Sequence, residues 1–322
     1  TSSLPNGLWR FNGYLMTRLT SAAIILRTRP YGESDLIIDL FTEQIGRTTA
    51  VAKGALRSKR RYMGTLEVGH LVKVDYPMKP GLSVLGPCDV LQGVRRVRDQ
   101  LSALRQLYYV LEICLNSTPY EERDEALFQS MVELISAIES EPGIDETSLF
   151  TWELTLFSHL GYHLKIGRCP FTGLAPDGLS AQAGGAISSA AGKPYWPVKT
   201  EALRVLYRLQ KRTSSSADYE QSLSAEDKQD LRAAFVGLWS EITGKNMKTN
   251  SIFTQLSLSV QDKSPLSDHS ASPSMSAQLL KSSALLIFLC LCSCQGLGER
   301  ISSTAVFEVQ PLRELNKDAS IP

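Results

Sequence analysis

The sequence predicts a small antiparallel β module followed by a helical region, because the period of its apolar residues changes near Arg98. Before that point, apolar and β-branched residues form short runs bounded by turn residues, as in strands. Charge divides at the same place: residues 16–98 hold 14 Lys or Arg against 7 Asp or Glu, whereas residues 99–322 hold 19 against 26. This asymmetry indicates a module that binds a polyanion, joined to a neutral or acidic one.

Five strands are predicted in the first module, over residues 22–28, 35–42, 47–53, 66–76 and 82–94. A small antiparallel sheet must protect its edges, and closing into a five-stranded barrel of the OB type does so. An SH3-like barrel fits the same pattern. We therefore assign residues 16–96 to a barrel domain.

A helical domain is predicted over residues 97–256, because apolar residues recur there with a helical period. Three helices precede Gly161, and two more cover residues 200–211 and 224–243, where Ser224 and Asp227 form a capping-box pattern. Between them, residues 162–198 are rich in Gly and Pro and are expected to form a long insertion.

Both ends of the chain are expected to be disordered. Residues 1–15 lack the pattern of a secretory signal and form an upstream extension, with Met16 as the expected start. Residues 257–322 form a polar tail, in which residues 275–294 resemble a bacterial lipoprotein signal. Such a signal acts at an N-terminus, so our hypothesis is that a neighbouring reading frame has been joined to this chain. The apolar run in it is too short for a membrane span, which needs about 20 residues.

No enzyme motif is present, and we expect no cofactor and no small-molecule substrate. The four histidines lack metal-site spacing, there is no Gly-x-Ser-x-Gly elbow, and the Gly-rich run at residues 184–193 lacks the glycine and hydroxyl positions of a phosphate loop. The uneven spacing of six cysteines fits a reducing compartment.

The positive signal is a basic run that follows the third predicted strand. It contains no acid, and together with a strand arginine it gives the predicted phosphate-binding set: Arg29, Lys53, Arg57, Lys59, Arg60 and Arg61. Single-strand binders combine such cations with aromatic rings that stack on bases. Tyr62 adjoins the run, and Tyr31 and Tyr76 are further candidates for stacking.

Several short motifs in these segments closely resemble the RecO family of bacterial recombination mediators. They are Tyr31-Gly32-Glu33-Ser34-Asp35, Gly46-Arg47, Ala52-Lys53-Gly54-Ala55 and Leu160-Gly161-Tyr162, and the likeness extends over residues 19–256. The resemblance implies an OB-fold and a helical domain, and a function in DNA repair and homologous recombination after DNA damage, in the RecF pathway. It also implies single-stranded DNA binding, strand annealing and loading of recombinase onto DNA coated by single-strand-binding protein.

The same resemblance implies two protein partners, RecR and the acidic C-terminal tip of single-strand-binding protein, and a cytoplasmic, nucleoid-associated location. Many members carry two Cys-x-x-Cys pairs that bind zinc in the insertion. Here only Cys169 remains, because Thr172, Ser188 and Ala191 stand at the other three positions. We therefore expect a degenerate zinc-finger-like insertion without metal.

We predict a non-enzymatic mediator that binds single-stranded DNA through the basic set and uses its helical domain for protein contacts. Two alternatives remain open from the residues. One is a protein-interaction adaptor with incidental DNA affinity, and the other is an RNA-binding OB protein.

Overall fold

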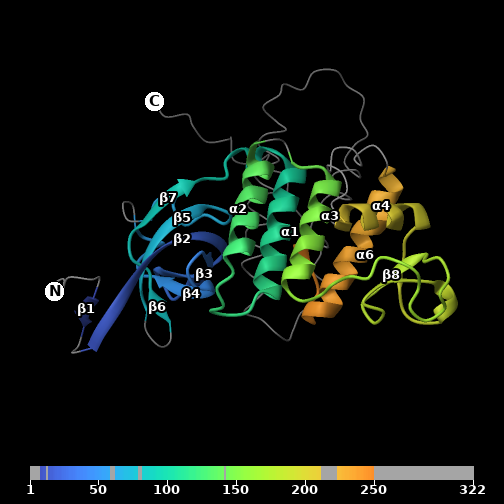
Figure 1. Ribbon diagram of the computed structural model, residues 1–322. Helices are drawn as coiled ribbons and strands as arrows, with labels where there is room; N and C mark the ends of the chain where they lie inside the picture. Colours follow the sequence, from blue (N-terminus) through green and yellow to red (C-terminus); the bar gives the residue numbers. More distant parts are fainter. Residues whose placement is uncertain are drawn as a thin grey trace, which may run out of the picture.

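A computed structural model describes residues 8–11, 14–58, 62–78, 82–140, 143–211 and 223–249 of the chain. A curled, mostly antiparallel sheet forms one end of the molecule, a group of helices packs beside it, and a small second sheet lies at the far end (Figure 1). The predicted order of a β module followed by a helical region is confirmed.

The larger sheet has seven strands, with six of them in the order β6-β4-β3-β2-β5-β7. Their bounds are β1 Leu8–Phe11, β2 Tyr14–Tyr31, β3 Asp35–Thr42, β4 Gly46–Ala52, β5 Leu71–Met78, β6 Ser83–Val84 and β7 Cys88–Gln92. β3 has the predicted bounds. β1 pairs with the start of β2, in a stretch where a disordered extension was predicted.

Two predicted strands differ from the observed ones because of turns. Residues 66–70 precede β5 as a turn, since Gly69 has a φ of +87° and its N–H donates to the carbonyl of Ile25. The strand predicted over residues 82–94 is divided into β6 and β7 at Pro87, which has no N–H to donate to a ladder.

The sheet curls around its own apolar core, and residues 83–86 link two strands that are not neighbours. β6 pairs with β4 in parallel, Leu85 N–H donates to Val51, and Gly86 N–H donates to Asp75 of β5. The enclosed core includes Ala23, Ile25, Ile38, Leu40, Ala50, Ala52, Val72 and Val74. The N-terminal part is thus a curled sheet that residues 83–86 help to close.

A β-bulge in β2 divides the outer face of this sheet into an apolar and a polar part. The β2–β3 register shifts between Ile25 and Arg27. On one side of the shift, Ile24 and Phe41 join the helical core, and the ring of Phe41 lies 6.1 Å from that of Phe128. On the other side, Arg27 lies opposite Asp39.

The helices match their predicted positions closely. They are α1 Leu101–Ser117, α2 Glu125–Ser140, α3 Glu146–His159, α4 Thr200–Lys211 and α6 Ala225–Thr243, with short 3-10 turns η1 Arg96–Asp99 and η2 Ser189–Ala191. The predicted capping box of Ser224 and Asp227 is present at the start of α6. Gly161, just after α3, has a φ of +82°, as its predicted place at a helix end requires.

The insertion forms a three-stranded sheet, β8 Gly178–Ser180, β9 Gly185–Ile187 and β10 Trp196–Pro197, where only a loop was predicted. It is fixed to α6 by Trp196. A Cβ atom placed on Gly237 of α6 would lie only 2.1 Å from the Trp196 ring, so a residue without a side chain is needed there. The insertion is therefore a packed part of the helical region.

A buried ion network joins α1, α3 and α6. The Glu153 carboxylate, which is fully buried, accepts hydrogen bonds from Arg232 (2.7 Å), Tyr109 Oη (2.6 Å) and Trp239 Nε1 (3.0 Å). Arg232 also binds Glu146 at 2.7 Å. Burial raises the pKa of Tyr109 well above its ordinary value, so its hydroxyl stays protonated and donates to Glu153.

The sheet and the helices also meet at Gly46, the first residue of β4, just after the turn from β3. Gly46 has a φ of +78°, and a Cβ atom there would lie 1.8 Å from the carbonyl oxygen of Glu122, in the α1–α2 connection. Next to it, the N–H of Glu121 donates to the carbonyl of Arg47 at 2.8 Å. Backbone thus packs directly on backbone.

Within the described part of the chain, the helices are too short or too polar to cross a membrane.

Gly46→Ala is expected to destabilise the protein more than Gly54→Ala. Both glycines have positive φ, which costs an alanine about 1 to 2 kcal/mol, but nothing lies within 4 Å of a Cβ on Gly54. The free energy of unfolding from urea titration measures the difference. Equal losses for the two variants would show that the contact with Glu122 is not tight.

Arg232→Met is expected to lower the free energy of unfolding by about 3 to 5 kcal/mol, because it leaves the Glu153 carboxylate buried and uncompensated. Adding Glu153→Gln should recover part of this loss by removing the charge. Arg204→Met is the control, since Arg204 and Glu201 form an exposed pair whose loss costs at most about 1 kcal/mol. No recovery in the double variant would contradict the network.

Candidate nucleic-acid interface

The polar part of the sheet's outer face is built from β2, β3 and β4. Alternate residues of a strand share a face, so Arg27, Arg29 and Tyr31 line up along β2 after the bulge. In register, Arg27 lies opposite Asp39 of β3, which lies opposite Thr49 of β4. We call the surface formed by Arg27, Arg29, Tyr31, Asp39 and Thr49 the polar face.

Asp39 lies at the centre of the polar face and is 4% exposed. One carboxylate oxygen accepts from Arg27 Nε at 2.7 Å and from a terminal nitrogen of Arg29 at 3.4 Å, and the other accepts from Thr49 Oγ1 at 2.7 Å. The arginine side chains remain 25% and 30% exposed. A phosphate can therefore approach both guanidinium groups while Asp39 stays buried.

The start of the basic run is fixed to the edge of the polar face by Asp35. Its carboxylate accepts from Gly54 N–H at 2.8 Å and from Lys53 Nζ at 2.6 Å. These two groups hold the pKa of Asp35 below its ordinary value, and Asp35 in turn raises the pKa of Lys53. Lys53 remains 55% exposed and fully charged at neutral pH.

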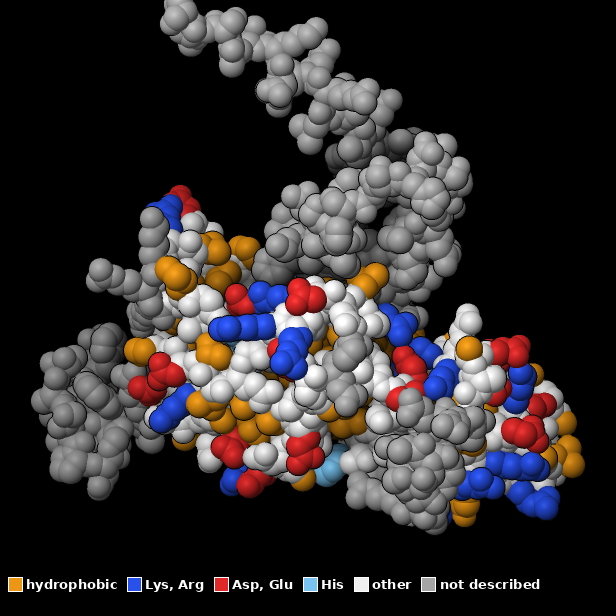
Figure 2. All heavy atoms as spheres, turned by 90° about the horizontal axis from the view of Figure 1, so that it is seen from above, with side chains coloured by type: hydrophobic (Ala, Val, Ile, Leu, Met, Phe, Trp, Pro, Cys, Tyr) orange, Lys and Arg blue, Asp and Glu red, His pale blue; other side chains and the backbone are white. Residues whose placement is uncertain are grey.

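Positive and negative side chains alternate over much of the surface. Arg57 lies 3.3 Å from Glu33, and both side chains are largely exposed. Figure 2 shows Lys and Arg beside Asp and Glu across one face of the molecule, without a continuous field of one sign. Exposed pairs of this kind contribute little stability, so the cations can exchange a carboxylate for a phosphate at small cost.

The structure brings together part of the predicted binding set. Arg29, Lys53 and Arg57 lie on or next to the polar face. Lys59, Arg60 and Arg61 lie outside the described residues, as does the side chain of Tyr76.

The tyrosines differ in their access to a ligand. Tyr62 is 4% exposed, and its hydroxyl donates to the carbonyl of Leu85 at 2.8 Å, so its ring packs inside the curled sheet and cannot stack on a base. Tyr31 is 50% exposed. Of the two candidate tyrosines whose side chains the structure describes, Tyr31 has the ring that a base can reach.

Three residues of the polar face escaped the sequence prediction, namely Arg27, Asp39 and Thr49. Arg27 could have been found from its alternation with Arg29 and Tyr31. Asp39 could have been noticed as a lone acid inside the apolar run of β3, where an unpaired charge would be costly.

A hollow of about 500 Å³ lies beside the polar face, between β2, α1 and the chain after α6. Its lining combines apolar residues such as Leu26 and Leu111 with the cations Arg27, Arg47, Lys245 and Lys248 and one acid, Glu112. Positive charge therefore continues from the sheet toward the helical region.

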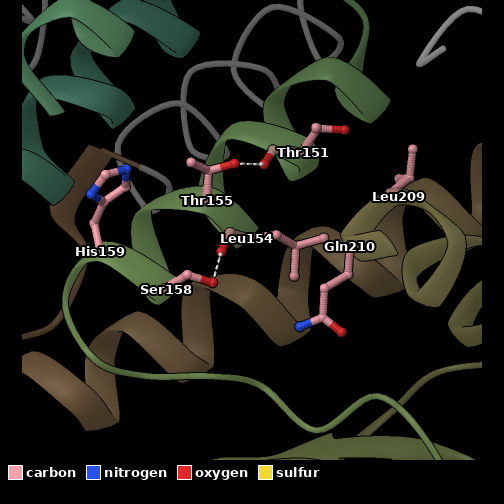
Figure 3. Close-up of a pocket in the computed structure, with 7 residues that line it drawn as sticks. All are labelled: Thr151, Leu154, Thr155, Ser158, His159, Leu209 and Gln210. Carbon is pink, nitrogen blue, oxygen red and sulfur yellow. Dashed lines mark hydrogen bonds between the residues drawn. The ribbon is translucent and has the colours of Figure 1, made fainter. Parts of the chain in front are cut away.

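Figure 3 shows a smaller hollow of about 330 Å³, between α3 and α4. The hydroxyls of Thr151, Thr155 and Ser158 donate to carbonyls four residues earlier in their own helix. The Gln210 amide donates to the carbonyl of Leu164. Most polar groups of this hollow are thus occupied within the protein, and we assign it no ligand.

The surroundings of Cys169 do not fit a zinc site. Burial alone would raise the pKa of its thiol, but hydrogen bonds from the Thr172 hydroxyl and from the N–H groups of Ser188, Phe171 and Thr172 lower it to about 7. In the described ranges, no three His, Cys, Asp or Glu residues are grouped as metal ligands. One thiol among hydroxyl and amide donors cannot provide tetrahedral zinc coordination.

Comparison with known proteins decides the family. The family described as "Recombination protein O N terminal" matches residues 16–94, and "Recombination protein O C terminal" matches residues 98–249. The chain belongs to the RecO family. The boundary between the two matched regions, between residues 94 and 98, coincides with the change from the curled sheet to the helices.

Several curated relatives agree with this assignment, and each is named "DNA repair protein RecO". The one from Myxococcus xanthus is 34% identical over 165 residues, covering 50% of this chain and 66% of that protein. The one from Geobacter sulfurreducens is 30% identical over 190 residues, covering 58% and 78%. The one from Anaeromyxobacter dehalogenans is 27% identical over 242 residues, covering 72% and 94%.

Family membership confirms two predictions. The chain is a DNA repair and recombination protein, and the RecO family consists of non-enzymatic recombination mediators.

Acidification is expected to release the start of the basic run from β3. Because the pKa of Asp35 is lowered in the folded state, the stabilisation is present above the unfolded value of about 3.9 and is lost as pH falls through the lower folded value. Protection of the Gly54 amide against hydrogen exchange, corrected for the intrinsic rate, measures this change.

Asp35→Asn is the matched control. It should show weak Gly54 protection at all pH values, because it carries no titrating carboxylate. Strong protection of Gly54 in this variant, or wild-type protection that does not fall as the pH is lowered, would contradict the role given to Asp35.

Proposed function

We propose that this chain mediates DNA repair by binding single-stranded DNA across the polar face and the basic run. The observation that carries this proposal is the alignment of Arg27, Arg29 and Tyr31 on one face of β2, next to Lys53 at the start of the run. The arginines can bind phosphates, and the half-exposed ring of Tyr31 can stack on a base. A surface that combines these groups suits a flexible single strand.

The curled sheet serves in this proposal as an OB-type barrel. OB folds bind oligonucleotides on the face of their second and third strands and on adjoining loops. Here the polar face lies on neighbouring antiparallel strands, and the basic run follows directly after β4. Fold and charge thus favour the same surface.

The phosphate contacts are assigned to Arg29, Lys53, Arg57, Lys59, Arg60 and Arg61, and the polar face adds Arg27. Arg29, Lys53 and Arg57 form ion pairs with acids within the chain. Binding then exchanges or shares these acids with phosphates, and its strength should depend steeply on salt.

The mediator role combines this binding with protein contacts. Neutralising the phosphates lets two complementary strands approach, which favours annealing. The helical region would bind RecR and the acidic C-terminal tip of single-strand-binding protein, so that recombinase is loaded on coated DNA. Annealing and recombinase loading would take place in the cytoplasm, at the nucleoid. The family assignment supports these steps through the DNA repair role that it carries.

The test is salt-dependent binding of a labelled single strand by the full chain. The logarithm of the binding constant should fall linearly with the logarithm of salt concentration, by about 0.7 per phosphate contact for a single strand. Replacing Arg57, Lys59, Arg60 and Arg61 with Ala should weaken binding and make this slope shallower.

A control variant replaces four cations of the helical region with Ala, namely Lys165, Arg204, Arg208 and Lys211. It removes the same charge and should leave the slope nearly unchanged. Weak wild-type binding that ignores salt, or equal effects of the two variants, would contradict the proposal.

A further inference from the structure

The position of Asp39 is unexpected for a surface that is proposed to bind DNA through its positive charge. It places a negative charge in the middle of a surface proposed to bind a polyanion. It is 4% exposed, although burying a carboxylate is costly unless it is paired. Its partners are two arginines of β2 and a hydroxyl of β4.

We propose that Asp39 is a positioning residue for DNA binding: it holds Arg27 and Arg29 side by side so that both guanidinium groups can meet the phosphates of one strand. This inference rests on the function proposed above. Asp39 itself does not touch the DNA, because it stays beneath the two arginines.

The geometry supports a role in orientation. One oxygen of Asp39 accepts a hydrogen bond from Arg27 Nε at 2.7 Å, so this contact uses only one of the three nitrogens of the guanidinium group. The same oxygen accepts a hydrogen bond from a terminal nitrogen of Arg29 at 3.4 Å, so one acceptor holds both side chains. The other oxygen accepts a hydrogen bond from the Thr49 hydroxyl at 2.7 Å, and this bond fixes the orientation of the carboxylate.

Thr49 is in turn held from the helical region. Its backbone N–H donates to the hydroxyl of Tyr120 at 3.1 Å, and the Tyr120 ring lies 5.6 Å from the guanidinium carbon of Arg47. The orientation of the two arginines is thus connected, through Asp39 and Thr49, to the contact between sheet and helices.

Two effects of Asp39 on DNA binding oppose each other, and they give a test with a defined sign. As a charge, Asp39 repels phosphate, so its removal would strengthen binding. As a positioning residue, it keeps two long, mutually repelling side chains in one arrangement, and ordering such side chains at the moment of binding weakens affinity. If Asp39 positions the arginines, its removal weakens DNA binding; if it acts only as a charge, its removal strengthens DNA binding.

The experiment is single-strand binding by the full-length Asp39→Asn variant over a range of salt concentrations. We expect binding about three- to tenfold weaker than in the wild type, with a shallower salt slope, although the variant is more positive. Asp89→Asn is the control, because Asp89 is exposed on β7 at the far side of β5 and its removal changes the net charge equally. This control should bind as well as the wild type or more tightly.

A second comparison separates positioning from a general loss of structure. In a background with Arg27→Ala and Arg29→Ala, adding Asp39→Asn should cause no further weakening, because the residue acts through these arginines. Circular dichroism melting of each variant reports folding independently.

Asp39→Asn binding that equals or exceeds the wild type would overturn the inference while leaving DNA binding intact. Weakening that persists without the arginines would also overturn it. If the wild-type chain itself fails to bind with salt dependence, the proposed function fails first, and the positioning role falls with it.

Discussion

The strand β2 contacts the core of the curled sheet, the helical core and the polar surface with only two faces. The rest of the structure depends on the bulge that makes this possible. The inner face encloses the core of the curled sheet. The outer face packs on the helices at Ile24 and Leu26, and then becomes polar from Arg27 onward. If the same residues of β2 alternated regularly through this point, with no bulge, the side chains after Leu26 would turn to the opposite faces. Arginines would then point into the apolar core.

This arrangement places the junction between sheet and helices next to the surface proposed to bind DNA. Phe41 packs against Phe128 of α2, and Gly46 lets the turn after β3 rest on the backbone of Glu122. The polar face begins within the same strands.

Local pattern was enough to predict much of the fold. β3 and α4 have their predicted bounds, because apolar alternation and helical period identify such elements without tertiary information. The capping box at Ser224 is also a local device, and it was found where predicted. In the candidate site, Arg29, Lys53 and Arg57 were predicted from charge and are placed together.

The remaining features depend on contacts between distant residues. The bulge after Ile25 is set by pairing with β3, and no residue marks it in the sequence. Tyr62 adjoins a basic run, yet its hydroxyl reaches a carbonyl 23 residues away and its ring is buried. The insertion forms strands and packs on α6 through Trp196, whose partner Gly237 lies some 40 residues later in the chain.

The buried Glu153 network also bears on the order in which the molecule is completed during synthesis. Glu153 leaves the ribosome 79 residues before Arg232, its cationic partner. The pairings of the larger sheet, in contrast, all lie before residue 93. The sheet can therefore form on the nascent chain, whereas the helical core cannot enclose Glu153 favourably until α6 has emerged. A chaperone that holds nascent chains would meet this protein as a folded sheet followed by open helices.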